Sequence, residues 1–216
     1  MKKRGRITIE SEDFSLLYDY DRALLKELTD DGKIKWFKER MNFIFINPIR
    51  LLWDRSGECY KKINTDEMPD IEHYGFNIAI FCTVLSGIES YGAFLKGVIK
   101  HARENKPNFS EYIQKYMKEW YKSIKIDGRQ RHLSDLLWDN CRNAIAHGFR
   151  ITEIGIDYIE AEGKEVRWGI MRGVFHINCF RFFQDFVVST SSFYKELEKN
   201  NAIRKAFLKT FNTFYP

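Results

Sequence analysis

The chain has 216 residues, a formal net charge of +5 at pH 7 and an aromatic content of 16%. This length suits one folded domain, with room for an appendage, and is ample for a buried core. The aromatic content excludes a chain that is disordered over most of its length. The basic bias is mild, so it permits an anionic partner such as nucleic acid without requiring one.

The four cysteines lie far apart and show neither a CxxC pair nor a Cys/His spacing typical of metal ligands: Cys59, Cys82, Cys141 and Cys179. We therefore expect reduced thiols, no metal site and no disulfide framework. No run approaches the roughly 20 apolar residues that a membrane span needs, and no apolar signal-peptide core follows the basic residues 1–6. The sequence thus predicts a soluble cytoplasmic protein with no cofactor and no membrane contact.

Residues 1–70 are predicted to form an N-terminal helical extension, which could pack into the same domain as the rest. Residues 1–10 are a basic arm that fits either a free terminus or a nucleic-acid contact. A helix is expected from Ser11, and a second one after Asp31-Gly32 that is interrupted or kinked at Asn47-Pro48. The polar stretch that follows is expected to be the connecting loop.

Residues 71–216 are expected to form the main domain, which begins with a long helix from Ile71 to about Ala102. Its apolar seam contains Glu89, and a carboxylate in a buried face is costly unless a cation pairs with it. Arg142 is the matching cation. Alternatively, Glu89 lies at the edge of the seam and reaches solvent.

Pro107 is expected to break the chain over Glu104 to Asn108, with a further helix from Phe109 to about Ile124. That helix interleaves aromatic and lysine side chains: Tyr112, Tyr116, Trp120 and Tyr121 with Lys115, Lys118 and Lys122. Such a pattern fits either the stacking of nucleotide bases or, more commonly, a core face beside a solvated face.

Residues 125–130 are expected to form a turn into the motif helix, which begins near Arg131 to Ser134. This helix carries an apolar stripe: Leu133, Leu136, Leu137, Cys141, Ala144 and Ile145. It also carries a polar stripe with a four-residue repeat: Asp135, Asp139, Asn143 and His147. The helix is expected to end in the hexapeptide Arg142–His147, with Gly148 in the left-handed conformation after it.

After Gly148 the sequence alternates between apolar and polar residues, which predicts a β-hairpin at about 151–172. Its facing residues are Ile154, Ile156 and Tyr158 on one strand and Val166, Trp168 and Ile170 on the other. Helical periodicity returns over about 178–199 and 202–214. The predicted fold is therefore all-α, an antiparallel helical bundle with one small β-hairpin inserted after the motif helix.

The hexapeptide Arg142–His147 resembles the signature of the HEPN superfamily, an Arg and a His separated by four to six residues near a helix end. The Glu-bearing segment Gly87–Tyr91 is similar to that family as well, and the resemblance covers about residues 71–200. It implies a ribonuclease that works without metal as a homodimer, with two motif helices forming one composite site. Many relatives act in toxin–antitoxin or anti-phage systems, which implies a nucleotidyltransferase-like antitoxin as a further partner.

The residue types suit RNA cleavage in their own right. RNA is cut by its own 2′-hydroxyl when a side chain moves protons near neutral pH and a cation faces the developing phosphorane charge. His147 suits the first role, because the unperturbed pKa of imidazole is about 6.5. Arg142 suits the second through its planar fork, and Asn143 could orient the imidazole or hold a phosphate oxygen. Glu89 and Asp139 are expected to support them.

Arg142 and His147 are five residues apart, which is about 140° around an α-helix, so they point in different directions. A composite site across a two-fold interface removes this difficulty, since each subunit can supply one group. Two other interpretations stay open. The domain could be a non-catalytic HEPN-like module that binds RNA, nucleotide or a protein partner. It could also be a helical interaction protein in which Arg142 pairs with Asp139 or Glu89 and His147 caps the helix.

Overall fold

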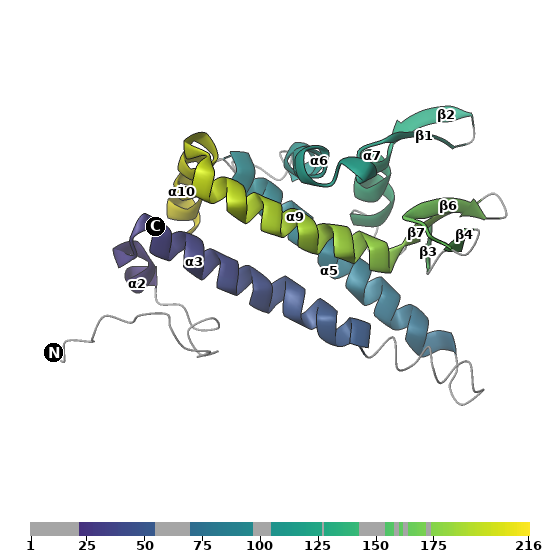
Figure 1. Cartoon of the computed structure of the whole chain (residues 1–216), viewed down its shortest axis with the longest axis horizontal. Coiled ribbons are helices and arrows are strands. Elements are labelled where there is room, and N and C mark those ends of the chain that lie inside the picture. The colour runs from purple at the N-terminus through teal and green to yellow at the C-terminus, as the bar shows by residue number, and fades with distance from the viewer. Residues whose placement is uncertain are drawn as a thin grey trace.

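The computed structural model describes residues 22–54, 70–96, 105–126, 128–142, 154–157, 160–161, 164–171 and 174–216. The longer helices are α2 (Arg22–Glu27), α3 (Asp30–Met41), α5 (Asp70–Lys96), α6 (Asn105–Tyr116), α9 (Cys179–Lys199) and α10 (Asn201–Phe214). The shorter helical segments are η1 (Asn42–Ile46), η3 (Lys118–Trp120), α7 (Leu133–Leu136) and η4 (Leu137–Arg142). The strands are β1 (Ser123–Ile126), β2 (Arg129–His132), β3 (Ile154–Asp157), β4 (Glu160–Ala161), β5 (Lys164–Glu165), β6 (Trp168–Met171) and β7 (Val174–Asn178). Most of the described chain is helical, which confirms the all-α expectation in its coarse form, with small sheets added (Figure 1).

The two longest helices, α5 and α9, run in the same direction. Phe81 of α5 contacts Phe182 of α9, and farther along both helices Tyr91 contacts Tyr194. The contacts advance together, so α5 and α9 are parallel, and the chain between them must return to its starting end (Figure 1). The antiparallel arrangement expected from the sequence therefore does not hold for this pair.

The helical stretch from α3 to residue 54 packs against α9 in the opposite direction. The Lys38 ammonium lies over the Tyr194 ring, whereas Trp53 packs on Phe180 at the other end of α9. Figure 1 shows these two long segments side by side. Helical turns continue through Pro48, so the predicted interruption is not a break. The π-helical segment η1 precedes the proline, and its wider turn accommodates a residue that cannot donate a backbone hydrogen bond.

The N-terminal helices share one hydrophobic core with the C-terminal ones. The Phe37 ring of α3 contacts the rings of Tyr91, Phe94 and Phe207, and Trp36 packs edge-on against Phe211. All six of these residues belong to a single buried cluster. The described part of residues 1–70 therefore contributes to the core of the main domain, while the predicted boundary near residue 70 stays a prediction.

Helix α6 crosses close to α5. Gly92 of α5 faces the backbone of α6, and a Cβ atom on it would lie 2.4 Å from the Asn108 carbonyl oxygen. One turn earlier on both helices, Asn105 donates a hydrogen bond to Glu89 at 2.7 Å. Farther along both helices, Lys96 pairs with Glu111. Figure 1 shows α6 nearly end-on while α5 lies lengthwise, so the two helices cross, and these polar contacts lie on either side of the crossing at Gly92.

The extent of α6 differs from the prediction at both ends. Pro107 was expected to break the chain, but it lies in the first turn of α6, where backbone N–H groups have no intrahelical acceptor to lose. The helix ends at Tyr116, and the following residues form η3 and then β1. Within the aromatic and lysine pattern, Tyr112 and Trp120 are fully buried, which confirms the core interpretation for these two residues.

The strands are arranged differently from the expected hairpin. Residues 123–132 form an antiparallel hairpin of β1 and β2, where the sequence predicted only a turn, and Gly128 at its tip has a φ of 77°. Strand β7 pairs parallel with β3 and antiparallel with β6, so the predicted facing strands are both neighbours of a third strand. The short antiparallel β4–β5 pair lies on either side of the turn predicted at Glu162-Gly163, and these two residues lie outside the described ones.

One helix among the described residues is long and apolar enough to cross a membrane by length and composition, namely Asn77–Lys96. This corrects the expectation that no such run exists. Of its apolar window, 61% is buried inside the protein, and side chains such as Phe81, Val84 and Ile88 are fully enclosed. The core helix of a soluble protein has the same character, so the solubility of the chain stays a prediction.

We expect Gly92→Ala to lower the free energy of unfolding by about 1–3 kcal/mol, because the added methyl group overlaps the α6 backbone. Urea denaturation followed by circular dichroism measures the change. Ser86→Ala, on the exposed side of the same helix, is the matched control and should stay within about 0.5 kcal/mol of the wild type. An unchanged denaturation midpoint for Gly92→Ala would contradict the close crossing of α5 and α6.

A second prediction concerns pH. Glu196 of α9 accepts a hydrogen bond from Tyr116 at 2.6 Å and pairs with Lys115 at 2.7 Å. Partial burial alone would raise the pKa of Glu196, but these two partners hold it below its usual value. The stabilisation by Glu196 is thus present above the unfolded pKa of about 4.3 and is lost as the pH falls through the lower folded pKa. The stability difference between wild type and Glu196→Gln should be constant above about pH 5 and shrink at lower pH. Urea titrations across this range measure it, and a pH-independent difference would contradict the assignment.

Candidate functional site

The motif helix begins at Leu133, directly after the last residue of β2. Its predicted apolar stripe is confirmed over the described residues, since four members have at most 2% exposure: Leu133, Leu136, Leu137 and Cys141. Arg142 is the last residue of the described helix, and nothing is described of its side chain. Asn143 and His147, the other two predicted catalytic residues, lie outside the described residues, as do Ala144 and Ile145.

The helix changes its winding just before the motif. Residues Leu137–Arg142 form a π-helical segment, in which backbone hydrogen bonds join residues five apart rather than four. The separation of about 140° between Arg142 and His147 assumes α-helical winding. The π-helical segment ends at Arg142, and the winding between Arg142 and His147 lies outside the described residues, so the angle between them stays a prediction.

The first half of the polar stripe binds one lysine. The Lys106 ammonium lies 3.2 Å from Asp135 Oδ1 and 3.0 Å and 3.1 Å from the two carboxylate oxygens of Asp139. Arg131, at the end of the β1–β2 hairpin, approaches Asp139 Oδ2 at 3.6 Å. Partial burial lowers the pKa of Lys106, but the hydrogen bonds that it donates to Asp139 and Asp135 outweigh this effect and raise the pKa above its usual value. Lys106 therefore stays charged at every physiological pH.

Glu89 is held at the same end of α6. Its side chain is partly buried and accepts the hydrogen bond from the Asn105 amide. Because Asn105 and Lys106 are consecutive, the first turn of α6 brings Glu89 of α5 and Asp139 of the motif helix into one neighbourhood. The structure thus gathers the two predicted supporting residues at one point.

The sequence prediction missed the three residues that hold these carboxylates, Asn105, Lys106 and Arg131. The stretch around Pro107 was interpreted as a chain break, which hid the first two. A usable signal was present in the motif helix itself. Asp135 and Asp139 are four residues apart on one stripe, and two adjacent carboxylates favour a cation between them.

If its role is structural, Arg142 is predicted to pair with Asp139 or Glu89. Asp139 is bonded by two other cations, Lys106 and Arg131, so its charge does not require Arg142. Glu89 accepts a hydrogen bond from a neutral amide, which does not balance a carboxylate charge. The pairing of Arg142 with Glu89 stays a prediction, because the Arg142 side chain lies outside the described ones.

Burial makes the nearby thiols unreactive. Burial, together with the neighbouring Cys82, raises the pKa of Cys141 far above its usual value, and burial raises the pKa of Cys82 to about 11. Both thiols are therefore protonated near neutral pH, and a thiolate is the form that attacks. A nucleophilic role next to the motif is thus excluded for Cys141.

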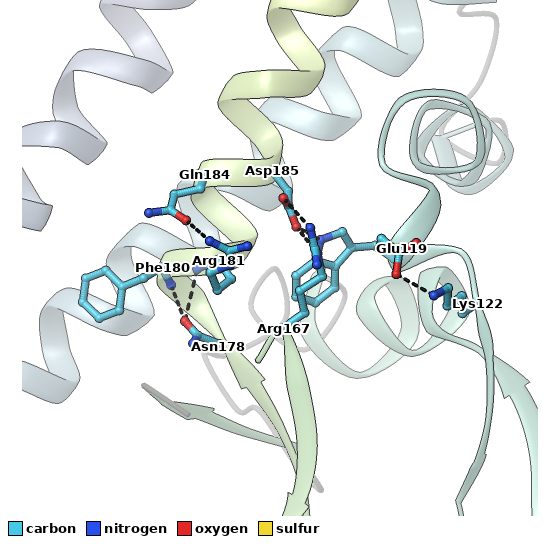
Figure 2. A network of polar contacts seen from close by, with 9 residues as sticks. Glu119, Lys122, Arg167, Asn178, Phe180, Arg181, Gln184 and Asp185 are labelled. Carbon is cyan, nitrogen blue, oxygen red and sulfur yellow. Dashed lines mark hydrogen bonds and ion pairs between the residues drawn. The ribbon is translucent and has the colours of Figure 1, made fainter. Parts of the chain in front are cut away.

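A polar network joins Trp120, just before the β1–β2 hairpin, and Arg167, just before β6, to Asp185 of α9. Asp185 accepts a hydrogen bond from the indole nitrogen of Trp120 at 2.9 Å and two from the Arg167 guanidinium, at 2.6 Å and 3.2 Å (Figure 2). The hydrogen bond to Asp185 raises the pKa of Arg167, which is permanently charged. Beside it, the Asn178 side chain caps α9 by accepting from the backbone N–H groups of Phe180 and Arg181 (Figure 2). One carboxylate thus ties the segment before β1 and the segment before β6 to the same helix.

Comparison of the chain with models of known protein families gives no match, and neither the curated proteins nor the solved structures give one. The resemblance to the HEPN superfamily therefore depends on the motif Arg142–His147 and the segment Gly87–Tyr91.

We expect Lys106→Met and Asp139→Asn each to lower the free energy of unfolding by roughly 0.2–1 kcal/mol. The effect is small because the two side chains are 38% and 37% exposed, so solvent screens their attraction. In a double-mutant cycle measured by urea denaturation, the two losses should be less than additive, since each variant removes the same pair. A cycle of Lys199→Met with Asp139→Asn is the control and should be additive. Additivity in both cycles would contradict the pairing.

Proposed function

We propose that the protein is a metal-independent endoribonuclease of HEPN type, which cuts RNA through attack by the 2′-hydroxyl and serves as a toxin or anti-phage effector. One observation carries the proposal. Asp139, which precedes Arg142 by three residues, is already paired with two other cations, Lys106 and Arg131. Asp139 therefore does not need Arg142 as a counter-ion, which supports a role for the motif's cation at a substrate phosphate.

The proposed reaction needs two proton transfers and one cation. The 2′-oxygen attacks the adjacent phosphorus as its proton is taken up, the bond from phosphorus to the 5′-oxygen breaks, and the leaving oxygen receives a proton. The products are a 2′,3′-cyclic phosphate and a 5′-hydroxyl. His147 moves these protons, and Arg142 stabilises the charge on the phosphorane oxygens. Asn143 orients the imidazole or holds a phosphate oxygen.

Glu89 and Asp139 act as positioning residues in this proposal. Through Asn105 and Lys106 they fix the first turn of α6 against both α5 and the motif helix. A motif at a helix end needs such support, because small displacements of a catalytic group are costly to the rate. The finer fold assignment, a bundle of HEPN type, belongs to the same proposal.

We further propose a cytoplasmic homodimer in which two motif helices face one another. Each subunit would then supply catalytic groups to the other's substrate, as the resemblance implies. A nucleotidyltransferase-like antitoxin is the proposed regulatory partner.

The test is cleavage of single-stranded RNA in EDTA by the wild type, Arg142→Ala and His147→Ala. We expect 2′,3′-cyclic phosphate ends from the wild type. We expect each variant to be slower by about 10²–10⁴-fold, the usual contribution of a placed proton-transfer group or oxyanion donor. Sizing chromatography coupled to light scattering reports the oligomeric state of the same samples.

Matched controls are Arg204→Ala and His176→Ala, which remove the same side-chain types elsewhere. Arg204 pairs with Asp31 at the surface, and His176 lies on β7 over Gly155. Both controls should cleave RNA at the wild-type rate. If the wild type binds RNA but no protein in the set cleaves it, the result would favour the non-catalytic HEPN-like module. Neither binding nor cleavage would favour the helical interaction protein.

A further inference from the structure

The β1–β2 hairpin extends away from the helices and is covered on only one face (Figure 1). The register places Ile124 opposite Arg131 and Ile126 opposite Arg129, and Ile124 is buried. The other face carries four exposed residues: Ser123, Lys125, Gln130 and His132. An isolated two-stranded hairpin gains little stability from itself, so an exposed polar hairpin calls for a role other than core packing.

Positive charge is concentrated in and beside this hairpin. Residues 118–132 contain five basic residues, Lys118, Lys122, Lys125, Arg129 and Arg131, against two acidic ones, Glu119 and Asp127. Five minus two gives a net charge of +3, more than half of the +5 of the whole chain. Lys122 pairs with Glu119 at 2.5 Å and Arg131 with Asp139, whereas Lys118, Lys125 and Arg129 have no ion pair to another described residue. The surplus suits a polyanion.

An aromatic pair lies at the base of the polar face. The rings of Tyr121 and His132 are stacked, with centroids 4.9 Å apart and planes 24° from parallel. His132 is exposed, and its Nδ1 is held by the Tyr121 carbonyl oxygen at 3.1 Å and by Ser123 Oγ at 3.2 Å. His132 thus presents an exposed ring in a fixed orientation on top of the partly buried Tyr121 ring, and an exposed ring held beside cations is a surface on which an unpaired nucleotide base stacks. An acidic protein segment would match the charge but would make no use of these rings.

The base of the hairpin is rigidly attached. Trp120, just before it, is fully buried and donates to Asp185 of α9 (Figure 2). The Leu133 N–H donates to the Lys122 carbonyl at 3.0 Å, which closes the two ends of the hairpin on one another. Because Leu133 is also the first residue of the motif helix, cations on the hairpin have a fixed position relative to that helix.

We propose that the β1–β2 hairpin is an arm that binds single-stranded RNA. Lys125 on the polar face and the exposed Arg129 on the other face each contact a phosphate, and the Tyr121–His132 stack carries a base on the polar face. One part of the inference rests on the proposed function, namely that the arm guides the bound RNA strand toward Arg142 for cleavage. Binding itself requires no cleavage, so the two proposals can fail separately.

The experiment measures binding by fluorescence anisotropy over a series of salt concentrations. The probe is a fluorescein-labelled 2′-O-methyl oligouridine, which lacks the attacking hydroxyl and cannot be cut. We compare the wild type with Lys125→Gln/Arg129→Gln and with the matched control Lys195→Gln/Lys199→Gln, which removes two exposed lysines from α9. Each phosphate contact contributes about 0.7 to the salt slope of single-strand binding. The hairpin variant should therefore bind several-fold more weakly, with a slope smaller by about 1.4, and the control should match the wild type.

Several outcomes would overturn the proposed arm. An unchanged slope in the hairpin variant does so even if the wild type cleaves ordinary RNA, and so does a wild type that does not bind the probe at low salt. Equal binding of polyglutamate, with the same loss in the variant, would make the hairpin a general anion surface. If the double variant melts at a lower temperature than the wild type, Lys125→Gln alone must still reduce the slope by about 0.7. If the hairpin binds the probe as predicted but the wild type does not cleave ordinary RNA, the result would contradict the proposed ribonuclease and support the RNA-binding arm.

Discussion

A backbone contact between Gly92 of α5 and Asn108 of α6 sets the position of everything around the motif. Only a residue without a side chain lets the two helices approach this closely. The approach places the first turn of α6 where Asn105 reaches Glu89 and Lys106 reaches the motif helix. The polar contacts of the site are therefore a result of how two helices pack.

Shared polar partners limit the cost of placing charged side chains close to the core. Lys106 serves two aspartates of one helix, and Asp185 serves an arginine and an indole from two different segments. Each arrangement satisfies several polar groups with one oppositely charged side chain, which limits the cost of partial burial. Both also connect elements that are far apart in sequence, so the charges help to hold the returning segment between α5 and α9 in place.

The periodicity of the sequence predicted the buried face of a single helix, but it did not predict how two elements pack or pair with one another. The apolar stripe from Leu133 to Cys141 follows from spacing alone, and it is buried as expected. The direction in which α5 and α9 pack has no counterpart in spacing, because a buried face looks the same whichever way its partner runs. Strand β7 could not be assigned as the centre of a sheet for a similar reason, since pairing partners are chosen across the chain. The β1–β2 hairpin was missed because its strands have only Ile124 and Ile126 as apolar members, too few for an alternating pattern.

The π-helical turn at Leu137–Arg142 has a consequence for how this chain is compared with others. A π turn contains more residues than an α turn over the same angle, so distance along the sequence and direction around the helix axis are no longer interchangeable. Two chains could place equivalent side chains at the same point in space with different numbers of residues between them.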